Sequence, residues 1–183
     1  QSSIQEIMIR LLSPLLLAIS TPLMAADNLR LDHDSKAGLI TVRRGASTIL
    51  TQVAGPTTRP YLHPIIAPDG KGALTEFSPG HHKHQTGLYW GFTRVNGRDH
   101  FHNLHSDYWK RNSAKIIERS GSSVSWQTSY DLLDVKGQAV LTQTQTWLMS
   151  SSNKEHTLDL TWKGKANTDV TIGKWKYGGL FLR

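Results

Sequence analysis

Residues 140–149 read VLTQTQTWLM, and the character of the side chains alternates along this stretch. Leu141, Trp147 and Met149 fall on one side of an extended chain, whereas the three threonines at 142, 144 and 146 fall on the other. Residues 156–162 (HTLDLTW) repeat the alternation. A period of two with one apolar side is typical of a half-buried β-strand, so both stretches are predicted strands.

Further strand-like segments lie N-terminal to these two. They cover residues 29–31, 39–43, 48–53, 88–95 and 123–126. Asn96-Gly97 predicts a hairpin turn, because both residues accept positive φ. The stretch 55–87 is interrupted by prolines and glycines, which predicts a long irregular loop. No segment after the N-terminal apolar run repeats with the 3.6-residue period of an amphipathic helix. The sequence therefore predicts an all-β fold, an antiparallel β-sandwich of roughly eight to ten strands.

The composition limits the classes of protein and partner. The 183-residue chain has 21 Lys and Arg against 14 Asp and Glu, a formal net charge of +7. Hydrophobic residues at 38% and charged residues at 19% indicate a packed domain rather than a disordered chain. The absence of cysteine excludes disulfides, a thiolate nucleophile and cysteine-ligated metals. The cations are scattered singly, so we expect a surface that favours anionic glycans or lipids and no nucleic acid partner.

The N-terminal region has the features of a secretory signal peptide. Met8 and Arg10 precede an apolar run over 11–19, and Ala25 and Ala26 provide small residues for cleavage. The run is shorter than the about 20 apolar residues that span a bilayer. This pattern predicts a periplasmic or secreted protein with no transmembrane segment in its mature chain.

These features divide the chain into two parts. Residues 1–26 are expected to be upstream residues and the signal peptide, and residues 27–183 the mature part. Residues 170–183 end within a strand-like segment. We therefore expect 27–183 to be the N-terminal part of a single β-sandwich domain that is truncated at its C terminus.

Histidines are concentrated in one region of the chain. Seven of the nine lie within residues 63–105. His82 and His84 are two residues apart, as are His100 and His102, and this spacing puts each pair on one face of a strand. Such a cluster fits a metal site of neutral imidazoles, a general acid or base, or hydrogen-bonding groups for a polyhydroxylated ligand.

The surrounding sequence favours the sugar interpretation over the metal one. There is no HExxH, GxSxG or Gly-rich phosphate loop. Few carboxylates lie near the histidines: Asp69, Glu76, Asp99 and Asp107. Metal-bound imidazoles usually donate to a carboxylate, so this scarcity argues mildly against a metal. A glycosidase needs a pair of catalytic carboxylates, and these few residues do not identify such a pair.

The tryptophans fall into two groups. Trp126, Trp147 and Trp162 occupy the apolar side of predicted strands, which places them in the core. Trp90 and Trp109 flank the histidine cluster. They are either further core residues or a stacking platform for sugar rings.

Three segments of this region form a combined pattern: residues 59–64 (RPYLHP), 79–91 (PGHHKHQTGLYWG) and 95–102 (VNGRDHFH). The pattern resembles the PmoA-like bacterial family of unknown function, with 178–183 as a weaker second match. The resemblance implies an exported β-supersandwich similar to galactose mutarotases and related carbohydrate-processing domains. It also implies that a histidine such as His84 acts as an acid on a sugar ring oxygen.

The leading hypothesis is an exported carbohydrate-active or carbohydrate-binding protein. Its candidate catalytic residues are His84, His82 and His102. Its candidate substrate-binding residues are Arg59, Tyr61, His63, His81, Trp90, Asn96 and His100. One alternative is a metal-dependent hydrolase or oxidase with His82, His84, His100 and His102 as ligands, and another is a non-catalytic interaction module. The sequence names no cofactor.

Overall fold

The computed structural model describes residues 28–183, which form eleven strands and no helix. The strands are β1 (Leu29–Asp34), β2 (Leu39–Arg44), β3 (Ser47–Val53), β4 (Tyr61–Ile65), β5 (Leu88–Gly91), β6 (Trp109–Glu118), β7 (Ser120–Gly121), β8 (Ser123–Leu133), β9 (Ala139–Ser151), β10 (His156–Ala166) and β11 (Gly179–Leu182). The predicted signal peptide lies outside the described residues. Within them, no helix is long and apolar enough to cross a membrane.

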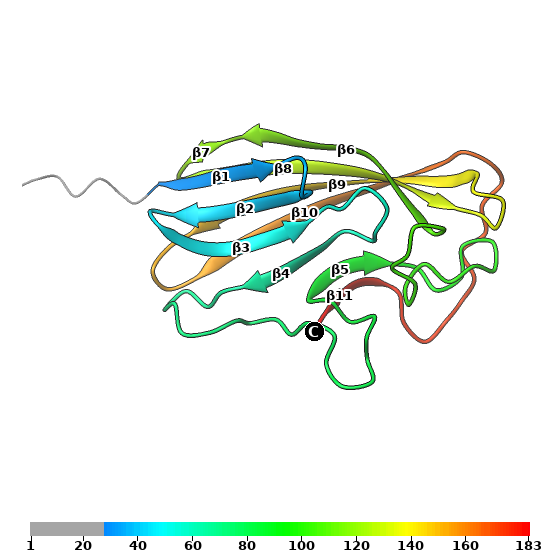
Figure 1. The fold of residues 1–183 in the computed structure, drawn as a ribbon, viewed down its shortest axis with the longest axis horizontal. Coiled ribbons are helices and arrows are strands. Elements are labelled where there is room, and N and C mark those ends of the chain that lie inside the picture. Colours follow the sequence, from blue (N-terminus) through cyan, green and yellow to red (C-terminus); the bar gives the residue numbers. More distant parts are fainter. Residues whose placement is uncertain (1–27) are drawn as a thin grey trace, which may run out of the picture.

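Two antiparallel sheets lie face to face (Figure 1). The larger sheet has seven strands in the order β11-β5-β4-β3-β2-β1-β7, and the smaller has four in the order β10-β9-β8-β6. All named strand pairs are antiparallel. The structure therefore confirms the predicted all-β antiparallel sandwich.

The main core lies between the two sheets. From the larger sheet, Leu31, Ile40 and Leu50 are fully buried, and Trp126 and Met149 are buried on the facing side of the smaller one. Burying one such side chain contributes about 1.5–3 kcal/mol to the free energy of folding. The alternation of apolar and polar residues along these strands is thus what selects the inward face.

Strand β9 follows its predicted alternation, with one addition. Trp147 lies opposite Trp126 of β8 and Leu160 of β10, so the predicted apolar face points inward. Gln143 and Gln145 share that face and are fully buried. Polar residues on the core side of a strand need internal partners, and Gln143 Oε1 accepts a 3.1 Å hydrogen bond from Trp162 Nε1.

Some boundaries differ from the sequence prediction. The predicted loop 55–87 contains strand β4, which pairs with β3 and β5 despite the surrounding prolines. Strand β5 ends at Gly91 rather than at Val95. Strand β6 was not predicted, because it is an edge strand whose sequence, WKRNSAKIIE, is mostly polar.

The tryptophans divide differently from the prediction. Trp126 and Trp147 are core residues as predicted, whereas Trp162 on edge strand β10 is only half-buried. Trp109 is fully buried and packs against Tyr130, so it is a core residue and its alternative as a sugar platform is wrong. Trp90 is half-buried and stacks on Trp162 across the two sheets, with ring centroids 5.0 Å apart.

Candidate functional site

A small pocket forms where two loops meet the end of strand β11. One loop precedes β5, and the other follows it and includes residues 98–103. The pocket has a volume of about 140 Å³. It is lined by His82, His84, Gln85, Phe101, His102, Tyr177 and Phe181. We refer to it as the histidine pocket. It brings together all three candidate catalytic histidines.

Within this pocket the imidazoles are in contact. The rings of His84 and His102 meet edge to face with centroids 4.3 Å apart. The ring of His82 lies 6.0 Å from that of His84, again centroid to centroid, and the ring of His81 lies 3.9 Å from that of His82 at a tilt of 40°. The predicted convergence of the two histidine pairs therefore occurs for His82, His84 and His102.

Asp99 holds His102 in one orientation. Its Oδ2 accepts a 2.7 Å hydrogen bond from Nδ1 of His102, and its Oδ1 accepts from the backbone N–H groups of Phe101 and His102. A carboxylate only accepts, so the proton of neutral His102 resides on Nδ1. Nε2 is then the unprotonated nitrogen, which can accept a proton from a bound molecule.

His84 has a different electrostatic environment. Burial, the neighbouring His102 and the Arg59 guanidinium lower the pKa of His84 to about 4. The ring is therefore neutral at neutral pH, with one N–H donor and one acceptor nitrogen. Burial also lowers the pKa of His82. Both shifts favour the neutral forms of His82 and His84, which hydrogen-bond through one donor and one acceptor nitrogen.

Arg59 supports both histidine-bearing loops from the interior. Its guanidinium donates to the backbone carbonyl oxygens of His84 and Phe101 and, at 3.2 Å, to Oγ1 of Thr86. The side chain is fully buried, and burial lowers its pKa to about 10, which still leaves it charged at neutral pH. Arg59 therefore positions the pocket, and its burial prevents direct contact with a ligand.

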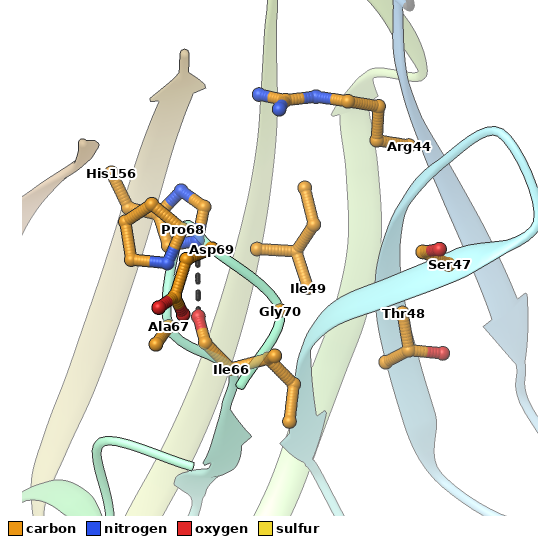
Figure 2. Close-up of a pocket in the computed structure, with 10 residues that line it drawn as sticks. All are labelled: Arg44, Ser47, Thr48, Ile49, Ile66, Ala67, Pro68, Asp69, Gly70 and His156. Carbon is orange, nitrogen blue, oxygen red and sulfur yellow. Dashed lines mark hydrogen bonds between the residues drawn. The ribbon is translucent and has the colours of Figure 1, made fainter. Parts of the chain in front are cut away.

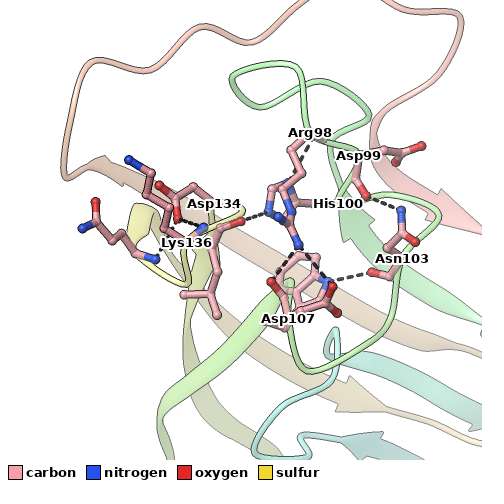
Figure 3. A network of polar contacts seen from close by, with 10 residues as sticks. Arg98, Asp99, His100, Asn103, Asp107, Asp134 and Lys136 are labelled. Carbon is pink, nitrogen blue, oxygen red and sulfur yellow. Dashed lines mark hydrogen bonds and ion pairs between the residues drawn. The ribbon is translucent and has the colours of Figure 1, made fainter.

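His100 and Asn96 also hold loops in place. His100 is fully buried, and its two ring nitrogens face the carbonyl oxygens of Leu133 at 3.1 Å and Arg98 at 3.3 Å. Figure 3 shows it within a network in which Arg98 also contacts Asp107. Asn96 uses its side-chain amide to bind the backbone of residues 169 and 171.

Tyr61 and His63 lie on strand β4, outside the lining of the histidine pocket. The exposed ring of Phe77 packs over both, with centroid distances of 5.7 Å and 5.5 Å. His63 Nδ1 lies 2.9 Å from Oγ1 of Thr75. Of the seven candidate substrate-binding residues, His81 alone lies next to the pocket on an exposed surface.

A comparison with family models gives one match. The model of a family of unknown function, DUF6807, matches residues 18–183. The chain belongs to the DUF6807 family. No curated protein and no solved structure matches it. The PmoA-like resemblance stays a prediction.

The geometry of this DUF6807 chain gives no support to the four-histidine metal site. Both ring nitrogens of His100 face backbone carbonyl oxygens, so neither is placed to coordinate a metal ion. Within residues 28–183, no group of three or more His, Cys, Asp or Glu side chains is arranged to hold a metal ion. The residues that converge fit hydrogen-bonding and acid–base chemistry better.

Four lining residues of the histidine pocket in the DUF6807 chain were not among the candidates: Gln85, Phe101, Tyr177 and Phe181. Asp99, which holds His102 from outside the lining, was not among them either. The three-residue spacing of Asp99 and His102 is the one local signal that could have indicated their pairing. Tyr177 and Phe181 come from the end of the chain, and only the pairing of β11 with β5 brings them to the histidines. Sequence periodicity carries no information on that pairing.

A larger cavity, of about 500 Å³, lies elsewhere on the molecule (Figure 2). Arg44, Asp69 and His156 are among its lining residues. The two nitrogens of His156 are already engaged, by Ser151 Oγ at 2.6 Å and by the carbonyl of Ile66 at 3.0 Å. This cavity is larger than the histidine pocket, but the ring of His156 uses its nitrogens to connect parts of the fold. They are therefore not free to bind a ligand.

Proposed function

We propose that this DUF6807 chain is an exported carbohydrate-binding or carbohydrate-active protein and that the histidine pocket contacts the sugar. Export rests on the signal-peptide features of the N-terminal sequence. The sugar assignment rests on the chemistry of the pocket and on the PmoA-like resemblance. The supersandwich relationship to galactose mutarotases is part of the same proposal.

The observation that carries the proposal is the Asp99–His102 pair facing the neutral ring of His84. Sugar hydroxyls both donate and accept hydrogen bonds, and neutral imidazoles offer one group of each kind. Tyr177, which is exposed and packs on the buried Phe101 with centroids 5.3 Å apart, adds apolar surface beside the imidazoles. Aromatic rings of this kind pack on the C–H faces of sugars, so the pocket combines both recognition elements.

The arrangement also suits general base chemistry. His102 Nε2 can take the proton of a bound hydroxyl, and the Asp99 carboxylate stabilises the imidazolium that forms. His84, neutral at neutral pH, donates its N–H to a second oxygen of the sugar. The structure thus supports proton transfer at a hydroxyl group without a requirement for a metal ligand set.

The test is glycan binding by the full chain, purified without a polyhistidine tag. We expect specific signals on a glycan array, confirmed by calorimetry, and a loss of about tenfold or more in affinity for His84→Gln and His102→Gln. His105→Gln, at an exposed position in the same region, is the matched control. Exchange between sugar anomers, followed by NMR, tests for turnover.

Elemental analysis of the same preparation tests the metal alternative. About one equivalent of zinc or copper that disappears in a His82→Ala, His84→Ala double variant would replace this proposal with the metalloenzyme. No binding to any glycan, by a folded protein, would leave the interaction module as the better hypothesis.

A further inference from the structure

A second hollow lies next to the histidine pocket and shares Tyr177 with it. Its volume is about 280 Å³. It is lined by Phe92, Thr93, Ile172, Gly173, Trp175, Lys176, Tyr177 and Gly178. We refer to it as the basic hollow. Trp175 and Tyr177 are 47% and 46% exposed, so two large aromatic rings reach solvent here.

Arg94 is fixed against the wall of this hollow. Its guanidinium carbon lies 3.9 Å from the centre of the Trp175 ring. The side chain reaches this position by crossing Gly173, where a Cβ atom would come within 3.0 Å of Arg94 Cβ and 3.2 Å of its Cδ. Glycine at 173 therefore leaves room for the arginine, and the stacking limits the guanidinium's freedom.

The segment that carries Trp175 is held to the loop after β5 at several points. Val95 forms a bridge with Ile172, and the backbone N–H of Gly173 donates to the carbonyl of Arg94 at 2.8 Å. Thr93 Oγ1 donates to the carbonyl of Tyr177 at 3.3 Å. The hollow is thus built before any ligand arrives, which lowers the entropic cost of binding.

The charged side chains at the basic hollow are cationic. Lys176 lines it, Arg94 lies on its lining residue Trp175, both cations are exposed, and none of its lining residues is acidic. Within residues 28–183, the Arg94 guanidinium makes no hydrogen bond to another residue. Its N–H groups are therefore available for a carboxylate or sulfate, which a guanidinium binds through two parallel hydrogen bonds.

We propose that the basic hollow binds the carboxylate or sulfate of an acidic polysaccharide, beside the histidine pocket. This inference rests on the proposed sugar-binding function and narrows its ligand to acidic glycans. Trp175 and Tyr177 pack on the sugar ring, while Arg94 and Lys176 bind its anionic group. The shared Tyr177 makes the two sites continuous.

The test compares tetrasaccharides by calorimetry at about 50 mM and about 300 mM salt. The probes are a galacturonate tetrasaccharide, a heparin-derived sulfated tetrasaccharide and a neutral galactose tetrasaccharide. We expect at least one acidic probe to bind about tenfold more tightly than the neutral one at low salt, and the preference to shrink at high salt. The two acidic probes distinguish carboxylate from sulfate.

Variants locate the effect. Arg94→Gln and Lys176→Gln are expected to lose most of the preference for the acidic probe and to retain binding of the neutral one. Lys110→Gln, which removes an exposed cation on β6, is the matched control and keeps the preference. A preference that Arg94→Gln leaves unchanged, or that Lys110→Gln reduces equally, would overturn the inference.

Two further outcomes separate this inference from the proposed function. Equal binding of neutral and acidic tetrasaccharides overturns the inference alone, because sugar binding itself survives. No binding of any tetrasaccharide overturns both. Vesicles of phosphatidylglycerol in phosphatidylcholine are the last probe: tighter, Arg94-dependent binding to them than to the glycans would assign the hollow to lipid headgroups instead.

Discussion

The guanidinium carbon of Arg59 lies 3.4 Å from the centre of the Tyr89 ring, and both side chains are almost fully buried. The ring face offsets part of the lost hydration of the cation, and backbone carbonyls of the two histidine-bearing loops accept its N–H groups. Burial in turn raises the pKa of the Tyr89 hydroxyl to about 12. A buried cation thus joins strand β5 to the loops that form the histidine pocket.

Arg59→Lys is expected to destabilise the fold although it keeps the charge. A lysine ammonium cannot lie flat on Tyr89 and donate to two divergent carbonyls, so buried acceptors lose their partners. We expect a loss of about 3 kcal/mol in the free energy of unfolding, measured by urea denaturation. Arg30→Lys, at an exposed position on β1, is the control and should change it by less than about 0.5 kcal/mol. Equal effects of the two variants would contradict the positioning role of Arg59.

Asp99→Asn is expected to change the tautomer of His102 rather than the fold. The carbonyl oxygen of the new amide would still accept from the two backbone N–H groups, so the amide N–H₂ would face Nδ1 of His102. The imidazole proton would then move to Nε2, which removes the base proposed for the pocket. Nitrogen-15 NMR of the histidine ring should report this exchange of the protonated nitrogen. An unchanged tautomer would show that Asp99 does not control His102.

The alternation in 140–149 and 156–162 was sufficient to predict the sandwich, because burial of one sheet face fixes the register of long strands. It could not predict β4 or β6. Strand β4 is short and is surrounded by prolines. Strand β6 forms because it pairs with β8, and its own composition does not indicate a strand. Both strands depend on neighbours that are distant in sequence.

The histidine pocket was predicted in part for a similar reason. The predicted turn at Asn96 is confirmed, with a φ of 49°. His82 and His84 both line the pocket, but they lie in turns and not on one face of a strand, so their spacing is not what brings them together. The same spacing in His100 and His102 misled, because this loop is not a strand and His100 points into the interior. Local spacing thus predicts a shared face only where the backbone is extended.

Lowering the pH should destabilise the protein well before its carboxylates are protonated. Burial lowers the pKa of five histidines: His63, His82, His84, His100 and His156. Below about pH 6.5 the unfolded chain therefore binds protons that the folded chain does not. The free energy of unfolding consequently decreases as the pH is lowered. For His84 this loss continues down to its folded-state pKa of about 4.

The measurement is the Tm between about pH 8 and about pH 4.5. We expect little change above about pH 7 and a continuous fall below about pH 6.5. His84→Gln should reduce the slope of that fall, whereas His105→Gln, at an exposed position, should leave it nearly unchanged. A Tm that stays constant or rises on acidification would contradict the burial of these imidazoles.

Gly87 and Gly45 offer a matched pair for the backbone that precedes β5. Both have positive φ, of 79° and 57°, so alanine at either position is strained by about 1 kcal/mol. At Gly45 no atom lies within 4 Å of the added Cβ, whereas at Gly87 that Cβ would come within 2.3 Å of the carbonyl oxygen of Leu62. This oxygen belongs to strand β4 and cannot rotate away.

Gly87→Ala should therefore lower the free energy of unfolding by about 3 kcal/mol, against about 1 kcal/mol for Gly45→Ala, as measured by urea denaturation. Because Gly87 follows the segment that carries His84, the first variant should also weaken the glycan binding that we propose for the histidine pocket, and the second should not. Equal losses of stability would mean that β4 and β5 do not approach each other as closely as the structure has them. In that case the pairing of Leu62 with Leu88, on which the position of His84 depends, would be in error.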